Sequence, residues 1–125
     1  AAAENILSRN FDIVWETHPS NPGRAWLTWG NGATRSDKQW SGVAWGAEVV
    51  ASGSDDTSFI RLRADQASGA VFSGIYQCSC SAVGNRDINE RHLTGGSATW
   101  TASFQVWGGP TTADPAHFKI DIATP

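Results

Sequence analysis

The sequence predicts an all-β fold, a single-domain antiparallel β-sandwich, with a closed or partly closed β-barrel as the alternative. Apolar and polar residues alternate with a period of two along most of the chain, as they do in half-buried strands. Turn-forming residues separate these stretches, and the links are too short for the helical crossovers that parallel strands need. Charged residues make up 17% of the chain, below the ordinary share of about 25%. Such a surface is typical of extracellular β proteins.

Seven or more strands are expected from the alternation. They cover residues 11–16, 24–29, 43–49, 58–65, 74–83, 98–107 and 117–123. Each strand is expected to turn its more apolar side toward the core, because burial of apolar surface drives folding. The aromatic residues on these predicted core faces are Phe11, Trp15, Trp29, Trp45, Tyr76, Trp100, Phe104 and Phe118.

Turn chemistry separates the predicted strands. Residues 19–23 (Pro-Ser-Asn-Pro-Gly) indicate a tight loop, and residues 30–32 (Gly-Asn-Gly) favour positive φ angles. The polar stretch 84–96 is expected to be a long loop, with room for one helical turn at residues 87–93. No repeat, linker or change in composition marks a boundary, and 125 residues is a common domain size. We therefore expect residues 1–125 to form a single β domain.

Net charge and composition limit the classes of partner and the cellular location that are expected. The formal net charge of −3 argues against nucleic acid as a partner, because phosphates are bound by Lys and Arg. No apolar run approaches the roughly 18 residues that indicate a transmembrane segment. The chain lacks Met and starts Ala-Ala-Ala-Glu, and small residues flank signal-peptidase sites. A secreted, extracellular protein is therefore expected; removal of an initiator Met, or a chain boundary set elsewhere, is the alternative.

Two cysteines, Cys78 and Cys80, lie two positions apart. On an extended strand they share a face at roughly 6.5–7 Å, whereas a disulfide needs Cβ atoms about 3.5–4.5 Å apart. Free thiols packed as small apolar side chains are therefore expected. A strained or intermolecular disulfide stays open, and a metal site lacks further ligands at a suitable spacing.

The seven Trp residues are the most distinctive feature of the sequence. A domain of this size has room to bury only some of them. Trp26 and Trp107 fall on predicted polar faces, and Trp40 follows polar residues in a predicted loop. An exposed Trp beside polar side chains can stack on a sugar ring while its neighbours bond the hydroxyls. The predicted ligand-binding residues are Trp26, Trp40, Trp107, Arg24, Asn31, Asp37 and Gln105.

We therefore expect a non-catalytic recognition module, a small carbohydrate-binding (lectin-like) protein whose partner is a glycan or another cell-surface ligand. A membrane- or cell-surface-binding toxin-like protein, a structural or assembly subunit, and a small secreted enzyme using residues 87–96 are the alternatives. A homo-oligomer fits several of them, because repeated weak sites gain avidity. No catalytic or cofactor motif is recognised. No cofactor is expected; a calcium site at Asp55, Asp56 and Asp87 is the alternative, although no loop matches a calcium-ligand pattern.

Overall fold

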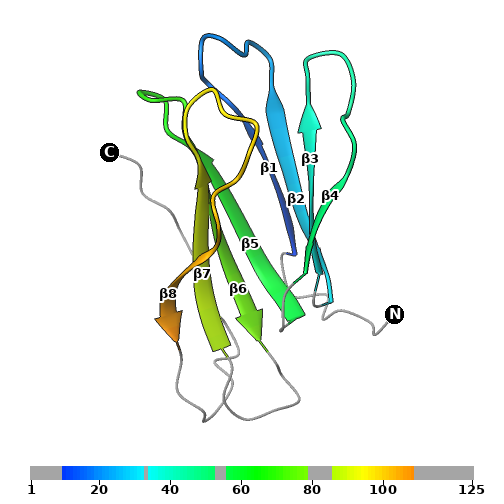
Figure 1. The fold of residues 1–125 in the computed structure, drawn as a ribbon, viewed down its shortest axis with the longest axis vertical. Coiled ribbons are helices and arrows are strands. Elements are labelled where there is room, and N and C mark those ends of the chain that lie inside the picture. The colour runs from blue at the N-terminus through cyan, green and yellow to red at the C-terminus, as the bar shows by residue number, and fades with distance from the viewer. Residues whose placement is uncertain (1–9, 33, 53–55, 79–85, 109–125) are drawn as a thin grey trace.

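The computed structural model describes residues 10–32, 34–52, 56–78 and 86–108. Eight antiparallel strands lie within this part of the chain (Figure 1). They are β1 (Phe11–Trp15), β2 (Ala25–Asn31), β3 (Thr34–Trp40), β4 (Val49–Ser52), β5 (Asp56–Ala64), β6 (Val71–Cys78), β7 (Arg86–Leu93) and β8 (Phe104–Gly108).

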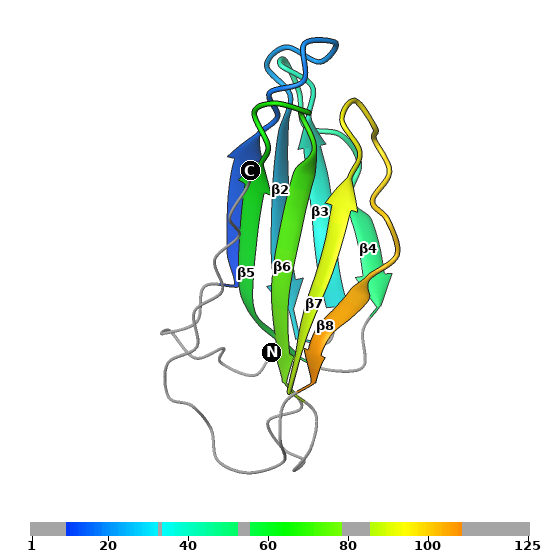
Figure 2. The same cartoon turned by 90° about the vertical axis from the view of Figure 1, so that its left-hand side faces the viewer.

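The strands form two four-stranded sheets, ordered β1-β2-β3-β4 and β5-β6-β7-β8. Neighbours in each sheet are consecutive in the chain. Figure 2 shows the second sheet in front of the first, with β5 lying against β1 and β2. This arrangement is a β-sandwich, which confirms the predicted fold class, and it is not a closed barrel.

The β5–β8 sheet follows the usual rule for an amphipathic sheet. Its inner face carries Ile60, Leu62, Val71, Ile75 and Leu93, all of which are fully buried or nearly so. Val71 and Leu93 pack with Trp26 of the other sheet into one cluster. The prediction that Ile60 and Leu62 face the core is thereby confirmed. Burial of these side chains supplies the apolar part of the interior. The predicted sides of β6 and β8 are wrong, because Ile75 is buried and Phe104 is exposed.

The β1–β4 sheet does the opposite, and the predicted sides of β1 and β2 are wrong. Asp12, Glu16 and Trp26 are buried, whereas Ile13 and Trp15 are exposed. The interior accepts the polar side of these strands because its charged groups pair with one another, which removes most of the cost of burying them. The alternation itself is as predicted; only the face that points inward differs.

Two strands were not predicted. β3 begins in the stretch expected to be a polar loop, and β7 occupies residues expected to be a loop or one helical turn. Both are polar on their two faces, so neither shows the apolar–polar alternation by which half-buried strands are recognised. Trp40 therefore lies at the end of a strand and not in a loop.

Other predicted boundaries shift. Of the predicted strand 43–49 only Val49 lies in a strand, because β4 covers residues 49–52, and the predicted strand 98–107 begins only at Phe104. Trp45 makes an isolated bridge with Trp40. The turn at residues 19–23 is confirmed, and Gly32 has a φ of 59°. Residues 117–123 and Cys80 lie outside the described residues. For Cys78 only the backbone in β6 is described.

Gly30 is a strand residue and not the turn residue that was predicted. A Cβ atom at this position would lie 2.7 Å from Cβ of Thr57. Thr57 belongs to β5, so Gly30 lets the two sheets approach closely where the chain passes from one to the other. Thr57 also donates its backbone N–H to the carbonyl of Gly32 at 3.0 Å. The absence of a side chain at Gly30 thus fixes the spacing of the sheets.

Candidate functional site

A buried ion pair joins the two sheets. Arg91 of β7 is 2% exposed and donates from Nη1 to Oδ2 of Asp37 at 2.7 Å, and its Nη2 donates to Oδ1 of the same carboxylate. Thr28 donates its hydroxyl to Oδ1 of Asp37 at 2.6 Å and accepts from Nη2 of Arg91 at 3.3 Å. The Trp100 ring covers the guanidinium, with its centroid 4.0 Å from Cζ of Arg91. This pairing explains how Asp37 is tolerated inside.

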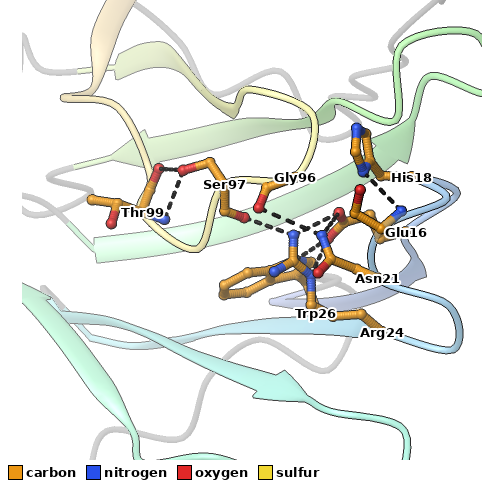
Figure 3. A network of polar contacts seen from close by, with 9 residues as sticks. Glu16, His18, Asn21, Arg24, Trp26, Gly96, Ser97 and Thr99 are labelled. Atoms are coloured by element: carbon orange, nitrogen blue, oxygen red, sulfur yellow. Dashed lines mark hydrogen bonds and ion pairs between the residues drawn. The ribbon is translucent and has the colours of Figure 1, made fainter.

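A second buried network surrounds Glu16 (Figure 3). Its carboxylate accepts hydrogen bonds from Arg24, including one from Nη2 at 2.5 Å, from Nε1 of Trp26 at 3.1 Å and from Nδ2 of Asn21 at 3.1 Å. Nη2 of Arg24 also donates to the carbonyl of Ser97 at 2.7 Å. Burial acts to raise the pKa of Glu16, but these hydrogen bonds and the charge of Arg24 outweigh it and lower the pKa.

These two networks tie the strands and loops of the two sheets together. Both carboxylates are occupied by Arg, hydroxyl, indole or amide donors. The Glu16 network ties β1 and β2 to the segment between β7 and β8, where His18 lies against Gly95 and Gly96. Within the residues that the structure describes, no three His, Cys, Asp or Glu side chains gather to hold a metal ion. Asp55 lies outside these residues, and the side chains of Asp56 and Asp87 are not described.

Because charged side chains face inward, the apolar side of the β1–β4 sheet faces outward. Directly opposed residues in antiparallel strands share one face, so the register defines three rows on this surface. The rows are Phe11–Trp29–Ser36–Val50, Ile13–Leu27–Lys38 and Trp15–Ala25–Trp40–Trp45. We call these residues the Trp face.

The Trp face is strongly apolar and open. Trp15 is 60% exposed and Phe11 57%, and Ile13, Trp45 and Val50 are also exposed. Leu27, Trp29 and Trp40 are partly buried by their neighbours in the rows. The rings of Trp40 and Trp45 lie 5.5 Å apart at an angle of 58°. A continuous apolar surface of this kind marks a binding site more often than an ordinary protein surface.

Lys38 is the single charged residue in the three rows, and it lies in the middle one. Ser36 lies in the row above it but is buried between Trp29 and Val50. The Trp face therefore offers ring faces and aliphatic groups in plenty, and few groups that form hydrogen bonds.

The structure does not gather the predicted ligand-binding residues into one site. Trp26 is 4% exposed and bonded to Glu16, so the expectation that it faces solvent is wrong. Arg24 and Asp37 are also buried, in the two ion pairs described above. Inside the sandwich, Glu16 is the hydrogen-bond partner of Arg24 and Trp26, and Arg91 is the partner of Asp37.

The remaining predicted site residues lie apart from one another. Trp40 belongs to the Trp face, and Asn31 is exposed at the end of β2. Gln105 is exposed on β8, in the other sheet. For Trp107 the structure describes the backbone in β8, so its predicted role stays a prediction.

Trp15, Trp29 and Trp45 were predicted to lie in the core, and the structure places them in the Trp face instead. The signal that was available is the row of charges at Asp12, Glu16 and Arg24 on the opposite sides of the same strands. That signal identifies two distinct faces without telling which of them is buried.

Within the described residues, no helix has the length and apolarity needed to cross a lipid bilayer. No family model matches the chain, and no curated protein and no solved structure matches it either.

Proposed function

We propose that this protein is a non-catalytic recognition module that binds carbohydrate through the Trp face, and that its ligand is the flat surface of an ordered, β-linked polysaccharide. The observation that carries the proposal is the exposure of Trp15 and Trp45 in one apolar surface whose other side is a charged interior. Keeping indole rings in water opposes the hydrophobic effect. A ligand that covers them recovers that free energy.

Ring stacking fits the geometry of the face. Trp15 and Trp40 lie in one row, two strand spacings apart, which corresponds to roughly 10 Å. A pyranose ring with equatorial hydroxyls presents an apolar C–H face that stacks on an indole ring. Two indoles at this separation suit successive rings of an extended chain.

The scarcity of polar groups favours an ordered polysaccharide over a free sugar. A soluble sugar would lose hydrogen bonds from its hydroxyls to water, and the Trp face offers chiefly Lys38 in return. Leaving such groups without partners costs free energy. In an ordered polysaccharide the hydroxyls already bond to neighbouring chains, so the exposed C–H surface is desolvated at little cost.

The positions of the carboxylates support a non-catalytic role. Glycoside hydrolysis needs two carboxyl groups that flank the scissile bond. Asp12, Glu16 and Asp37 point to the interior, on the opposite side of the sheet from the Trp face. The three rows of the Trp face contain no carboxylate.

Assembly with a further protein layer is the second candidate function. It is favoured by the aliphatic side chains of Ile13, Leu27 and Val50, which sugar stacking does not require and which are common in the cores of protein interfaces. In that case the Trp face packs against another subunit.

Sedimentation with insoluble polysaccharides tests the proposal, with cellulose, chitin and a β-1,3-glucan as probes. Trp15→Ala is expected to weaken binding about tenfold, since loss of one stacked ring is worth about 1–2 kcal/mol. Phe104→Ala is the matched control, because Phe104 is an aromatic residue exposed at 68% on the other sheet. Binding to none of the three probes, or equal binding by both variants, would contradict the proposal.

Light scattering after size exclusion separates the two candidates. A monomer that sediments with polysaccharide supports the carbohydrate role. A stable dimer that Ile13→Ser dissociates, together with no polysaccharide binding, favours assembly. Co-sedimentation with liposomes but not with polysaccharide would assign the Trp face to lipid headgroups instead.

A further inference from the structure

Arg35 is a partly buried cation on the inner side of β3. Its polar contact is a hydrogen bond from Nη1 to Oγ of Ser103 at 3.4 Å, at the far limit of such bonds. Its Nε atom is buried without a hydrogen-bond partner. The carboxylate that attracts Arg35 is that of Asp37, whose oxygens already accept hydrogen bonds from Arg91 and Thr28. Among the described residues, Arg35 therefore has no ion-pair partner.

The electrostatic surroundings of Arg35 confirm this imbalance. Burial, and then the charge of Arg91, lower the pKa of Arg35 to about 10, and the attraction of Asp37 does not compensate. The guanidinium still carries its charge at pH 7. Two cations thus share one carboxylate, which leaves one positive charge in excess where the two sheets and residues 100–103 meet.

Two further donors in this region lack acceptors. Nε of Arg91 and Nε1 of Trp100 are both buried without a hydrogen-bond partner. Trp100 packs on Arg91 and lies three residues before Ser103, which contacts Arg35. Unpaired buried donors are rare in folded proteins and ask for an explanation. The three unpaired atoms are N–H donors, so an acceptor with negative charge is what they lack.

We propose that Arg35 and Ser103 form a binding subsite for one oxyanion, a carboxylate or a sulfate group, with the charge of Arg91 and the indole of Trp100 behind it. Arg binds such groups with paired, charge-assisted hydrogen bonds. A bound anion would neutralise the excess charge and restore the pKa of Arg35 toward its usual value. The subsite lies on the inner side of the β1–β4 sheet, so it is distinct from the Trp face and independent of the function proposed there.

Arg63 provides a charge-matched control for Arg35. Both residues are arginines with one positive charge, but Arg63 belongs to β5 and lies on the outer side of the other sheet, outside the Trp face. Arg35→Gln and Arg63→Gln therefore change the net charge of the protein equally. A general attraction between anions and the protein would fall by the same amount in both variants.

The test is a titration of the whole protein at pH 7 and constant ionic strength with sulfate, acetate and glucuronate, with glucose and chloride as controls. Thermal unfolding and calorimetry report binding, and the side-chain ¹H–¹⁵N signals of the Arg Nε and Trp Nε1 groups report its place. The wild type and Arg63→Gln are expected to show the same saturable response. Arg35→Gln is expected to bind at least about tenfold more weakly.

The same titration distinguishes an acidic sugar from a sulfate group as the oxyanion that the subsite binds. A stronger response to glucuronate than to acetate assigns the subsite to an acidic sugar, whereas a stronger response to sulfate assigns it to a sulfate group.

Arg35→Gln without anion is expected to melt no lower than the wild type, because it removes an unpaired cation. An unchanged response in Arg35→Gln, an equal response to chloride, no response to any anion, or a melting temperature several degrees lower in Arg35→Gln would overturn the proposal.

Discussion

The two sides of the β1–β4 sheet differ in a way that reverses the usual pattern of a sandwich. The inner side carries the Asp37–Arg91 and Glu16–Arg24 ion pairs, and the outer side carries exposed Trp and aliphatic residues. The difference shows that pairing, and not polarity alone, decides which side can be buried. Charged groups that satisfy one another can occupy an interior, whereas apolar groups left in water gain nothing from folding.

The second sheet shows that this reversal is local. On β5 and β6, Ile60 and Ile75 point inward, while Arg63 and Phe72 lie on the outer side. The ordinary pattern therefore holds for β5 and β6, whereas β1 and β2 are reversed; on β8, Phe104 and Val106 are also exposed. A general property of the sequence, such as its composition, cannot account for the exposed Trp residues.

Loss of the Asp37–Arg91 ion pair from the inner side of the β1–β4 sheet is expected to have the largest effect on stability. Arg91→Met leaves the Asp37 carboxylate buried without its cation, and the free energy of unfolding is expected to fall by about 3–5 kcal/mol. Urea unfolding measures the change. Arg63→Met, on the outer side of the other sheet, is the control and is expected to cost less than about 1 kcal/mol. Equal losses in the two variants would contradict the buried pairing.

Glu16→Gln is expected to have a smaller effect, about 1–3 kcal/mol, because Arg24 loses its counter-charge but keeps the carbonyl of Ser97. The variant also changes the pH dependence. The pKa of Glu16 is lower in the folded protein than its ordinary value of 4.5. Its contribution to stability is therefore complete above that value and is lost as the pH falls through the lower, folded pKa.

Unfolding measured from pH 7 to pH 2 checks this second prediction. The wild type is expected to lose stability below pH 4.5 more steeply than Glu16→Gln, which lacks the titrating group. Parallel curves for the two proteins would show that Glu16 is not held in its charged form.

The smallest effect on stability is expected on the outer side. Trp15→Ser removes a ring that is 60% exposed, and the free energy of unfolding is expected to change by no more than about 0.5 kcal/mol. The same urea titration measures it, with Ile13→Ser as a second variant in the next row. A loss of more than about 2 kcal/mol in the free energy of unfolding would mean that these side chains pack inside the monomer. It would contradict the exposure of the outer side of the β1–β4 sheet.

Much of the fold was predictable from local pattern. Alternation located β1, β2 and β5, and the Pro- and Gly-rich turn before β2 was also predicted correctly. These features depend on neighbouring residues only. Trp100 was expected in the core and does pack against it, although it belongs to a loop and not to a strand.

The orientation of the first sheet was not predictable in the same way. It depends on the pairing of Asp37 with Arg91, which lie 54 positions apart in the chain. β3 and β7 contribute one partner each, and each strand taken alone is too polar to be recognised. Because Trp26 and Trp15 follow this orientation, the predicted surface residue is buried and the predicted core residue is exposed.

Two pairs of packed Trp rings give the molecule a natural optical reporter. Indoles held a few ångströms apart at an angle couple their electronic transitions, which produces a paired band in circular dichroism. The Trp40–Trp45 pair lies on the open surface, whereas the Trp26–Trp100 pair, 5.6 Å apart at 74°, lies inside. Whatever covers the Trp face will rotate or shield the first pair and leave the second as a constant background, so occupancy can be followed without a label.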